Sequence, residues 1–490
     1  MKLAGFVLVM FTLFSKVLSF STPRSSFASR ARSSVRLYKT NPNRMGRENR
    51  PFKLNVETKE KAVKNSVPTM EFDMMIEGIT ATAILEKGKA RLFQDGNPIV
   101  YGGAIGSIQG SPVSGDQIMI CDHNGNLIAR GIYNSESMYR VRVLVTKDET
   151  SLFSLPIEDL LAVRFANALR MRATTLGVGE SERNDEVFRL INGEGDRLGG
   201  LIVDVIGNVI VAQSSAAWCE KHKDAIMQEL TKLNIGNLAS TVVWRRAVSR
   251  LNQDGFHSSD SSDAEPIEDS AEDIVVKEGN CQYSVNPLGG GQKTGFYCDQ
   301  RENRKRIMKL SDGKTVLDTY CYTGGFSINA ALGGAKSVTS VDSSQPALDS
   351  FAKNLVLNNL SDGVVDIVKA DAVAFMKKCA EEGKQFDIVI CDPPKLAPSR
   401  KDLDRAKNKY KKINQLGLSL VKPGGLFLTC ACSGAMTQDP LLFKRIIADA
   451  GRASKRDVTI INTSGAAMDH PVHPAYPEGA YLTAVLVHVN

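Results

Sequence analysis

The chain has 490 residues, enough for two or three domains, and its 42% hydrophobic and 23% charged residues are ordinary for a folded protein. The formal net charge of +7 is unevenly placed, because nine of the 61 Lys and Arg residues lie in residues 1–47, where there is no Asp or Glu. The rest of the chain carries 52 basic and 54 acidic side chains, which excludes a uniformly basic surface. The nine cysteines include no Cys-x-x-Cys pair, so neither a disulfide framework nor a metal site is expected.

Residues 1–47 are predicted to be a targeting leader with two parts. An apolar run over residues 3–14 is typical of a secretory signal, and residues 21–47 are rich in Ser and Arg, as in organelle transit peptides. This combination resembles the bipartite presequences of algae with complex plastids, so we expect import into a plastid; a mitochondrial presequence or secretion is the alternative. No later segment has the ~18 consecutive apolar residues of a membrane helix, so no membrane association is expected for the mature chain.

The next segments predict a linker and two small domains. Residues 48–79 are polar and are interpreted as a linker, and residues 80–148 alternate short apolar runs with Gly turns, which predicts a small β-barrel. Asn124-Gly125 between two apolar runs is a strong hairpin signal. Residues 149–284 read as a central α+β domain, with a helix over 155–176 and strands near 187–191, 201–206 and 209–213. Within it, residues 254–273 carry eight acidic and no basic side chains, which predicts a disordered insert.

From residue 285 to 490, strands and helices alternate. Strands are expected at 315–318, 337–342, 365–368, 386–392 and 425–430, with helices at 303–310, 345–358, 372–378 and around 410–420. This alternation predicts a doubly wound α/β sheet, in which ligands bind outside the carboxyl ends of the strands.

Acidic and glycine residues stand where a cofactor would bind in such a sheet. Asp318 ends the first strand, and Thr323-Gly324-Gly325 makes the turn into the next helix, where glycine lets the backbone approach a ligand closely. Asp342 ends the following strand, at the place of an acid that accepts ribose hydroxyls, and Asp371 follows the third strand. Each residue alone is more often a cap or turn residue; together they favour a ligand site, which we extend to the neighbouring Tyr320, Phe326, Ser343 and Ala372.

Residues 392–395 (Asp-Pro-Pro-Lys) and Cys432 are the candidates for chemistry. The two prolines fix a rigid turn after the fourth strand that could press a flat base beside a methyl donor, with Asp392 and Pro393 also near the cofactor. Carbon 5 of a pyrimidine is a poor nucleophile until a thiolate adds to carbon 6, and Cys432 follows the strand expected next to the one that ends at Asp392. Cys391 and Cys430 are interpreted as packing residues. These motifs look like the cofactor and catalytic loops of an S-adenosylmethionine-dependent methyltransferase.

Two clusters of basic residues are candidate RNA contacts. The first runs over residues 401–412 with Tyr410, and the second contains Arg301, Arg304, Lys305 and Arg306. A solvated helix face is an equally good interpretation of the first. The segment His470-Pro-Val-His473 lacks an acid or Cys to complete a metal site, so we expect an ordered loop near the active site.

The motifs in their order resemble the RlmI-like family of bacterial large-subunit ribosomal RNA cytosine-5 methyltransferases over residues 80–490. The strongest matches are the segments 293–304, 322–326, 392–395, 432–434 with 436–437, and 469–471 followed by 476–479. The resemblance implies a PUA domain, a central α+β domain, a Rossmann-like class I methyltransferase domain, S-adenosyl-L-methionine as cofactor and 5-methylcytosine formation with Cys432 as nucleophile. It also implies that Asp299, Gln300 and Arg301 approach the cofactor.

The resemblance further implies large-subunit rRNA or a pre-ribosomal particle as partner, and it leaves a homodimer open. The family pattern His-Pro-Trp-Val-Phe-Ser-Gly of the PUA domain is replaced here by Asn97-Pro-Ile-Val-Tyr-Gly-Gly103. Asp392, Lys395 or water is expected to remove the proton from carbon 5. Two other functions stay open: methylation of an exocyclic amine or another RNA position without a thiol, and an inactive RNA-binding assembly factor.

Overall fold

The computed structural model describes residues 76, 78–79, 81–178, 185–233, 235, 241–257, 273–287, 295–360, 363–397 and 400–490. The predicted leader at 1–47 and nearly all of the predicted linker at 48–79 lie outside these residues. Most of the predicted acidic insert, residues 258–272, lies outside them too. Two of its eight acidic residues are described: Asp254 is buried and paired with Arg142, and Asp273 pairs with the exposed Lys353.

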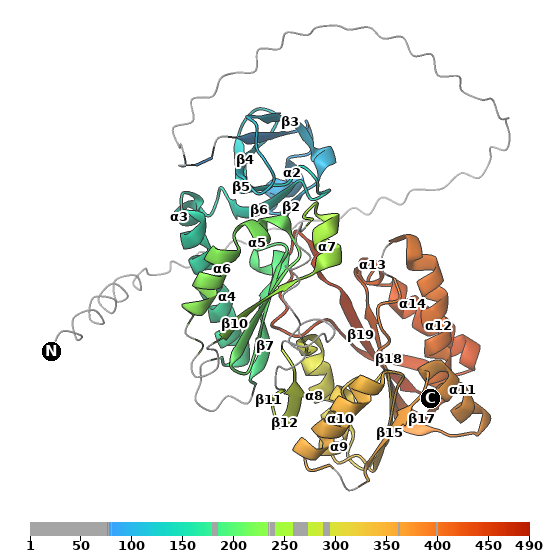
Figure 1. The fold of residues 1–490 in the computed structure, drawn as a ribbon. Helices are drawn as coiled ribbons and strands as arrows, with labels where there is room; N and C mark the ends of the chain where they lie inside the picture. The colour runs from blue at the N-terminus through green and yellow to red at the C-terminus, as the bar shows by residue number, and fades with distance from the viewer. Residues whose placement is uncertain are drawn as a thin grey trace, which may run out of the picture. The chain divides into compact units, whose positions relative to one another are not determined.

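The first folded segment is the expected small β unit, drawn in blue in Figure 1. Its sheet has the order β2-β6-β5-β4-β1-β3. The Asn124-Gly125 turn joins the antiparallel β4 and β5, and Gly125 takes a φ of 86°, which confirms the hairpin. The strands are β1 (Thr82–Leu85), β2 (Ile99–Val100), β3 (Ile105–Gln109), β4 (Gln117–Cys121), β5 (Leu127–Tyr133) and β6 (Val141–Thr146), accompanied by α2 (Arg91–Gln94), η1 (Gly102–Ala104) and α3 (Thr150–Phe153).

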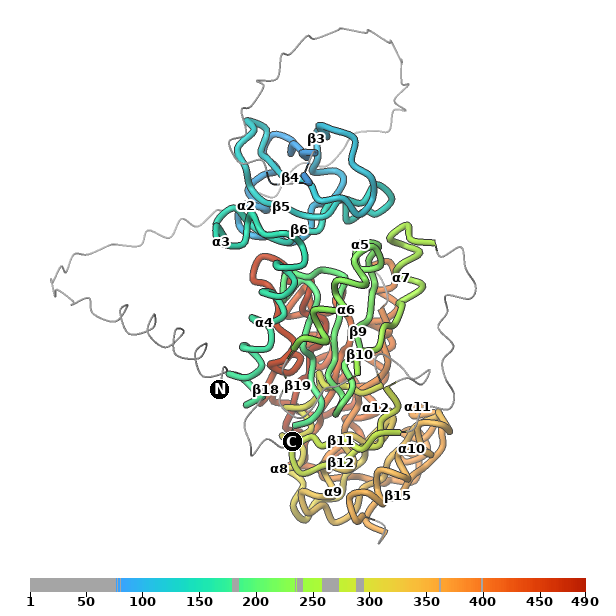
Figure 2. Tube along the Cα trace, turned by 60° about the vertical axis from the view of Figure 1, so that its left-hand side comes forward, coloured from blue at the N-terminus to red at the C-terminus, as the bar shows by residue number. Residues whose placement is uncertain are grey.

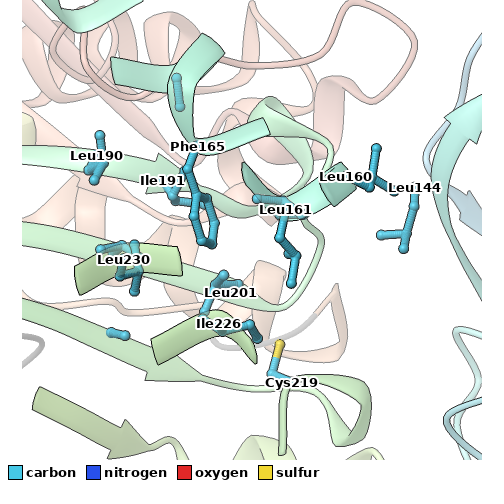
Figure 3. Close-up of a cluster of buried hydrophobic side chains, with 14 of the residues drawn as sticks. Leu144, Leu160, Leu161, Phe165, Leu190, Ile191, Leu201, Cys219, Ile226 and Leu230 are labelled. Atoms are coloured by element: carbon cyan, nitrogen blue, oxygen red, sulfur yellow. The ribbon is translucent and has the colours of Figure 1, made fainter. Parts of the chain in front are cut away.

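The second segment packs helices on a four-stranded sheet of order β10-β9-β8-β7. Helix α4 (Ile157–Leu176) starts after Pro156 and ends at Gly177 in the left-handed conformation. Figure 3 shows Leu161 and Phe165 of this helix in one buried cluster with Leu201, Ile226 and Leu230. The other elements are β7 (Val187–Asn192), η2 (Gly193–Asp196), β8 (Leu201–Ile206), β9 (Val209–Ser214), α5 (Ala217–Lys221), α6 (Lys223–Thr231), β10 (Thr241–Arg246) and α7 (Val248–Gln253).

The third segment contains a seven-stranded sheet of order β15-β14-β13-β16-β17-β19-β18, in which β19 is antiparallel to both neighbours. It confirms the predicted doubly wound α/β class, and Figure 2 traces the same elements in a second view. Strands β11 (Ile274–Glu278) and β12 (Cys281–Val285) form a hairpin ahead of it. The strands are β13 (Thr315–Thr319), β14 (Ser337–Asp342), β15 (Val365–Lys369), β16 (Phe386–Cys391), β17 (Val421–Cys432), β18 (Val458–Ser464) and β19 (Leu482–Val489).

The helices of this segment follow the expected positions closely. Among the predicted helices only α12 differs clearly, because it begins about seven residues earlier than predicted. The long helix over residues 442–454 and the strands β18 and β19 were not predicted. The helices are η4 (Cys298–Gln300), α8 (Arg301–Leu310), α9 (Gly325–Leu332), α10 (Gln345–Leu357), α11 (Ala372–Glu381), η5 (Arg400–Asp402), α12 (Leu403–Ser419), α13 (Gly434–Thr437), α14 (Leu442–Ser454) and η6 (Pro477–Gly479). None of the helices in the described part of the chain is long and apolar enough to cross a membrane.

Candidate active site

The loop between β13 and α9 has a strained backbone. Tyr320 and Tyr322 take φ values of 64° and 50°, which are unfavourable for side chains other than glycine. Gly324 takes a φ of 86°, and a Cβ atom there would lie 2.1 Å from the ring of Phe351. Such strain is concentrated at ligand sites, and the missing Cβ lets the Phe351 ring pack directly against the backbone at the N-terminus of α9. Thr323 and Phe326 flank this glycine, so the predicted turn residues lie together.

Asp318 is buried at the end of β13, directly before this loop. Its Oδ2 accepts a hydrogen bond of 2.6 Å from Ser327, whose hydroxyl is 2.8 Å from that of Ser340. Its Oδ1 has no hydrogen-bond partner among the described residues. Burial, and to a smaller extent the nearby Asp392 carboxylate, raises the pKa of Asp318 to about 7. A buried carboxylate oxygen without a partner fits a cofactor that carries a cationic group.

Asp342 and Asp371 have turn and capping roles as well as suitable positions. Asp342 accepts hydrogen bonds from the backbone amides of Tyr322 (3.0 Å) and Ser344 (2.9 Å), so it holds the cofactor loop against the end of β14. Asp371 caps α11 through Ala374. Both oxygens of a carboxylate can accept further bonds, so these contacts are compatible with ligand binding. Of the neighbours predicted with them, Ser343 is exposed and Ala372 is buried.

Strands β16 and β17 bring Asp392 and Cys432 together. The two strands pair in parallel, with Cys391 opposite Thr429, so their carboxyl ends share one edge of the sheet. The Sγ atom of Cys432 lies 3.7 Å from Oδ1 of Asp392. Cys432 is the last residue of β17, whereas the sequence suggested that it follows the strand. It is also the one cysteine among the nine that is not buried.

The other predicted residues of this edge differ in accessibility. Pro393 is buried, while Lys395 is exposed. Partial burial of its ammonium group lowers the pKa of Lys395, helped by the charge of Arg250 and opposed by Cys432. Cys391 and Cys430 are fully buried, which confirms that they are packing residues.

Gln300 and Arg301 were both expected near a cofactor, but in the structure their side chains have different partners. Gln300 donates a hydrogen bond of 2.9 Å from Nε2 to Oδ2 of Asp392, so it belongs to the catalytic edge. Arg301 is fully buried, and its guanidinium group donates to Oδ2 of Asp469 (3.0 Å) and to the carbonyl oxygen of Val187 (2.7 Å). The expectation that Arg301 approaches the cofactor is therefore corrected: its donors hold the central segment and the segment before β19.

The second predicted RNA patch is also corrected. Arg304 is buried and bonds both oxygens of Glu278, so neither it nor Arg301 is on the surface. In α12, Arg405 is paired with Asp402 at the end of η5 and Lys407 with Asp404 of the same helix, while the other basic residues of this stretch remain a candidate contact. Tyr410 is fully buried, so it is a core residue and cannot stack on a base.

The loop with His470 is ordered, as expected. Asp469 is buried, and besides Arg301 it accepts from the backbone amide of Arg189 and lies 2.8 Å from Nδ1 of His470. Opposite charge, chiefly that of Arg301, outweighs burial and holds the pKa of Asp469 well below its usual range. Among the described residues there is no group of three or more His, Cys, Asp or Glu that could hold a metal ion.

Sequence reasoning missed some partners of the predicted residues. Asn303 donates a 2.6 Å hydrogen bond to Gln300, and Tyr481 donates one of the same length to Asp299. The rings of Tyr297 and Tyr322 meet edge to face at 5.4 Å beside the strained loop. The spacing of Gln300 and Asn303, three residues apart at the start of a helix, was the one available signal.

A Rossmann-like sheet with a strained glycine loop and a buried acid at its first strand end fits an S-adenosylmethionine-dependent methyltransferase. Comparison with protein families agrees: residues 222–454 match the S-adenosylmethionine-dependent methyltransferase model, and residues 83–146 match the PUA-like domain model. A crystal structure of a putative methyltransferase complexed with SAH has the same fold, with a TM-score of 0.67 at 18% identity, covering 83% of this chain and 99% of that one.

Curated relatives define the family more narrowly. The chain is 35% identical to ribosomal RNA large subunit methyltransferase I of Photobacterium profundum over 413 residues, covering 84% of this chain and 100% of the relative. It is 35% identical to the protein of the same name from Vibrio parahaemolyticus, covering 82% and 98%. The chain belongs to this ribosomal RNA large subunit methyltransferase I family, and its cofactor is S-adenosylmethionine.

Proposed function

We propose that the protein makes 5-methylcytosine in large-subunit ribosomal RNA through a covalent adduct with Cys432. The observation that carries this proposal is the 3.7 Å approach of the Cys432 sulfur to the Asp392 carboxylate at the carboxyl ends of β16 and β17. Relatives named for large-subunit rRNA methylation support the substrate class. The family fold supports the methyl donor.

The thiol gives carbon 5 the nucleophilicity that it lacks. The Cys432 thiolate adds to carbon 6 of the cytosine, forming an S–C bond and moving an electron pair toward carbon 5. S-adenosylmethionine, when bound, would supply an electrophilic methyl group to carbon 5 and would leave as S-adenosylhomocysteine. A base then removes the proton on carbon 5, and the electron pair released expels the thiolate from carbon 6. Asp392 is next to the sulfur, and Lys395 follows on the same turn, so either side chain, or water, is a candidate base.

Residues of this chain have separate tasks in that scheme. Asp318 and the amides near Gly324 would hold the methyl donor, with Asp342 fixing the loop that contains them. The Pro393-Pro394 turn would limit where a flipped base can rest, because enzymes that act on a base must take it out of its stack.

Methyl transfer can be measured from labelled S-adenosylmethionine to unmodified large-subunit rRNA, followed by digestion to nucleosides. Wild-type enzyme should place the label in 5-methylcytidine, and Cys432→Ala should place none. RNA that carries 5-fluorocytidine should trap a stable adduct with the wild type only, because fluorine cannot leave as a proton does. Label in an amine-methylated nucleoside, or full activity without the thiol, would establish the amine reaction instead. RNA binding without any transfer would favour an inactive assembly factor.

We also propose that the leader directs the protein to a plastid. Its apolar first part and its Ser- and Arg-rich second part support this location. Residues 1–47 fused to a fluorescent protein should accumulate in the plastid of an alga with complex plastids. Accumulation in mitochondria or secretion of the fusion would contradict the proposal.

A further inference from the structure

A chain of hydrogen bonds runs from α8 to the proposed nucleophile. Gln300, Asn303 and Arg306 are three residues apart, so they share one face of the helix start. Asn303 donates from Nδ2 to Oε1 of Gln300 (2.6 Å), and Gln300 donates from Nε2 to Oδ2 of Asp392 (2.9 Å). The other carboxylate oxygen of Asp392 is the one that faces the Cys432 sulfur.

The direction of every bond in this chain is fixed by chemistry. Arginine can only donate, and Nη1 of Arg306 lies 2.8 Å from Oδ1 of Asn303, so that atom must be the amide oxygen. The hydroxyl of Ser464 donates to the same oxygen at 2.8 Å. The NH2 group of Asn303 must therefore face Gln300, and the NH2 group of Gln300 must face Asp392. Asn303 and Gln300 are only 1% and 3% exposed, so water does not compete for these bonds.

We propose that Asn303 and Gln300 are positioning residues that hold the Asp392 carboxylate as a hydrogen-bond acceptor aimed at the Cys432 thiol. This inference rests on the proposed role of Cys432 as nucleophile. A donor on Oδ2 stabilises the ionised carboxylate and stops it from rotating, so that Oδ1 stays against the sulfur. Arg306 and Ser464 fix the orientation of the Asn303 amide. That orientation in turn fixes the Gln300 amide, whose NH2 group faces Asp392.

The thiol has other polar neighbours that any pH measurement will reflect. Besides Asp392, the groups that interact electrostatically with Cys432 include one residue each from the segment before η4, the turn after β16, α12, β17 and the position just before β19. They are Tyr297, Lys395, Tyr410, Cys430 and Tyr481. Cys430 is hydrogen-bonded to the side chain of Gln300, so a change in Gln300 also acts on this thiol, while the other four groups keep their charges.

Two isosteric variants remove the hydrogen-bond donor that faces Asp392 without changing the shape of the side chains. Asn303→Asp keeps the acceptor for Arg306 and Ser464 but removes the donor, so Gln300 must turn its NH2 group toward the new carboxylate and its oxygen toward Asp392. Gln300→Glu keeps the acceptor for Asn303 and sets a second carboxylate against Asp392. Gln385→Glu is the matched control, because Gln385 is an exposed residue between α11 and β16.

The first readout is the rate of Cys432 alkylation by iodoacetamide against pH, measured by peptide mass spectrometry on the full-length enzyme without RNA or cofactor. Because the other eight cysteines are buried, modification should be selective. Losing the donor makes Asp392 a stronger acceptor and keeps the sulfur protonated, so both variants should move the alkylation midpoint upward by ~0.5 pH unit or more. Asp392→Asn should move it downward, and Gln385→Glu should leave it unchanged.

The second readout is methyl transfer. Both isosteric variants should lower kcat ~10-fold or more, with the KM for S-adenosylmethionine unchanged, and should shift the acid limb of the pH profile upward. Unchanged alkylation midpoints in both variants would overturn the inference. Failure of the proposed function alone would look different: the midpoints would shift, but the wild type would form no adduct with 5-fluorocytidine RNA.

Discussion

Two acid-centred networks of the molecule use similar residues for different ends. At the catalytic edge, Asp392 is partly exposed, accepts from the neutral amide of Gln300 and faces a thiol. At the second network, which we term the arginine clasp, Asp469 is fully buried and accepts from Arg301 and from the amide of Arg189. A neutral donor leaves a carboxylate available for chemistry, whereas a buried guanidinium group commits it to structure.

The arginine clasp also explains why clusters of basic residues in this sequence are unreliable indicators of RNA contacts. Arg172 is buried, pairs with Asp196 and donates to the carbonyl oxygen of Asp469. Arg172 and Arg301 reach Asp469 from 297 and 168 residues away in the chain, so they join segments that the sequence separates widely. A run of arginines therefore indicates an RNA surface only when the acids that could pair with it are known to lie elsewhere.

The largest expected effect is at the catalytic edge. Cys432→Ala should reduce formation of 5-methylcytidine by at least ~10³-fold, because carbon 5 loses its covalent activation, while the midpoint of urea unfolding stays close to that of the wild type. Cys379→Ala is the control: it removes a buried thiol far from this edge and should cost ~1 kcal/mol of stability with activity retained. Equal activity in wild type and Cys432→Ala would show that the thiol at the catalytic edge has no role in the chemistry.

Disrupting the arginine clasp should have the opposite effect, which is a large loss of stability. Asp469→Ala leaves Arg301 buried without its main partner, which should lower the free energy of unfolding by ~3–5 kcal/mol in urea titrations. Exchanging an exposed acid such as Asp404, paired with Lys407 on α12, should cost under ~0.5 kcal/mol. A small loss for Asp469→Ala would mean that the clasp is not a stabilising structure.

A third carboxylate, that of Asp318, differs from the acids of both networks because its pKa is raised, and the pH dependence of stability tests this difference. Burial raises the pKa of Asp318 to about 7, so the folded protein keeps this proton at pH values where the unfolded chain has lost it. The stabilising effect is complete below about pH 4 and is lost as pH rises through about 7. Relative to Asp318→Asn, cofactor-free wild type should therefore lose ~2–4 kcal/mol of unfolding free energy between about pH 4 and about pH 8. A difference that does not depend on pH would show that Asp318 is ionised throughout.

The sequence predicted the order of most elements up to β17 because its signals are local, whereas α14, β18 and β19 were not predicted. Alternating apolar runs, the Asn124-Gly125 turn and the strand-end acids are each contained within a few residues, and the structure places them as expected. It also predicted that β16 and β17 are neighbours, since a doubly wound sheet has few alternative orders. That topology was enough to bring Cys432 to Asp392.

What could not be predicted depends on partners far away in the chain. The role of Arg301 is decided by Asp469, which lies 168 residues later, and that of Arg304 by Glu278 on a separate hairpin. The early start of α12 is different, because Leu403, Ala406 and Tyr410 have helical spacing and pack into the core, so this local signal was present but was hidden among charged residues. The bond from Gln300 to Asp392 spans 92 residues and has no sequence signature beyond the helix spacing.

The smallest effect tests whether the cofactor loop needs Gly324 for its conformation or for the space beside it. Gly324→Ala combines a strained φ of 86° with a clash against Phe351, whereas Gly313→Ala has a φ of 66° and no atom within 4 Å. The control should therefore cost only the backbone term of ~1 kcal/mol, and Gly324→Ala should cost ~1–2 kcal/mol more. Calorimetric titration with S-adenosylhomocysteine should show weaker binding for Gly324→Ala alone, because relief of the clash must move the loop that follows Asp318. Equal losses of stability and affinity in the two variants would mean that Phe351 yields freely and that the loop tolerates displacement.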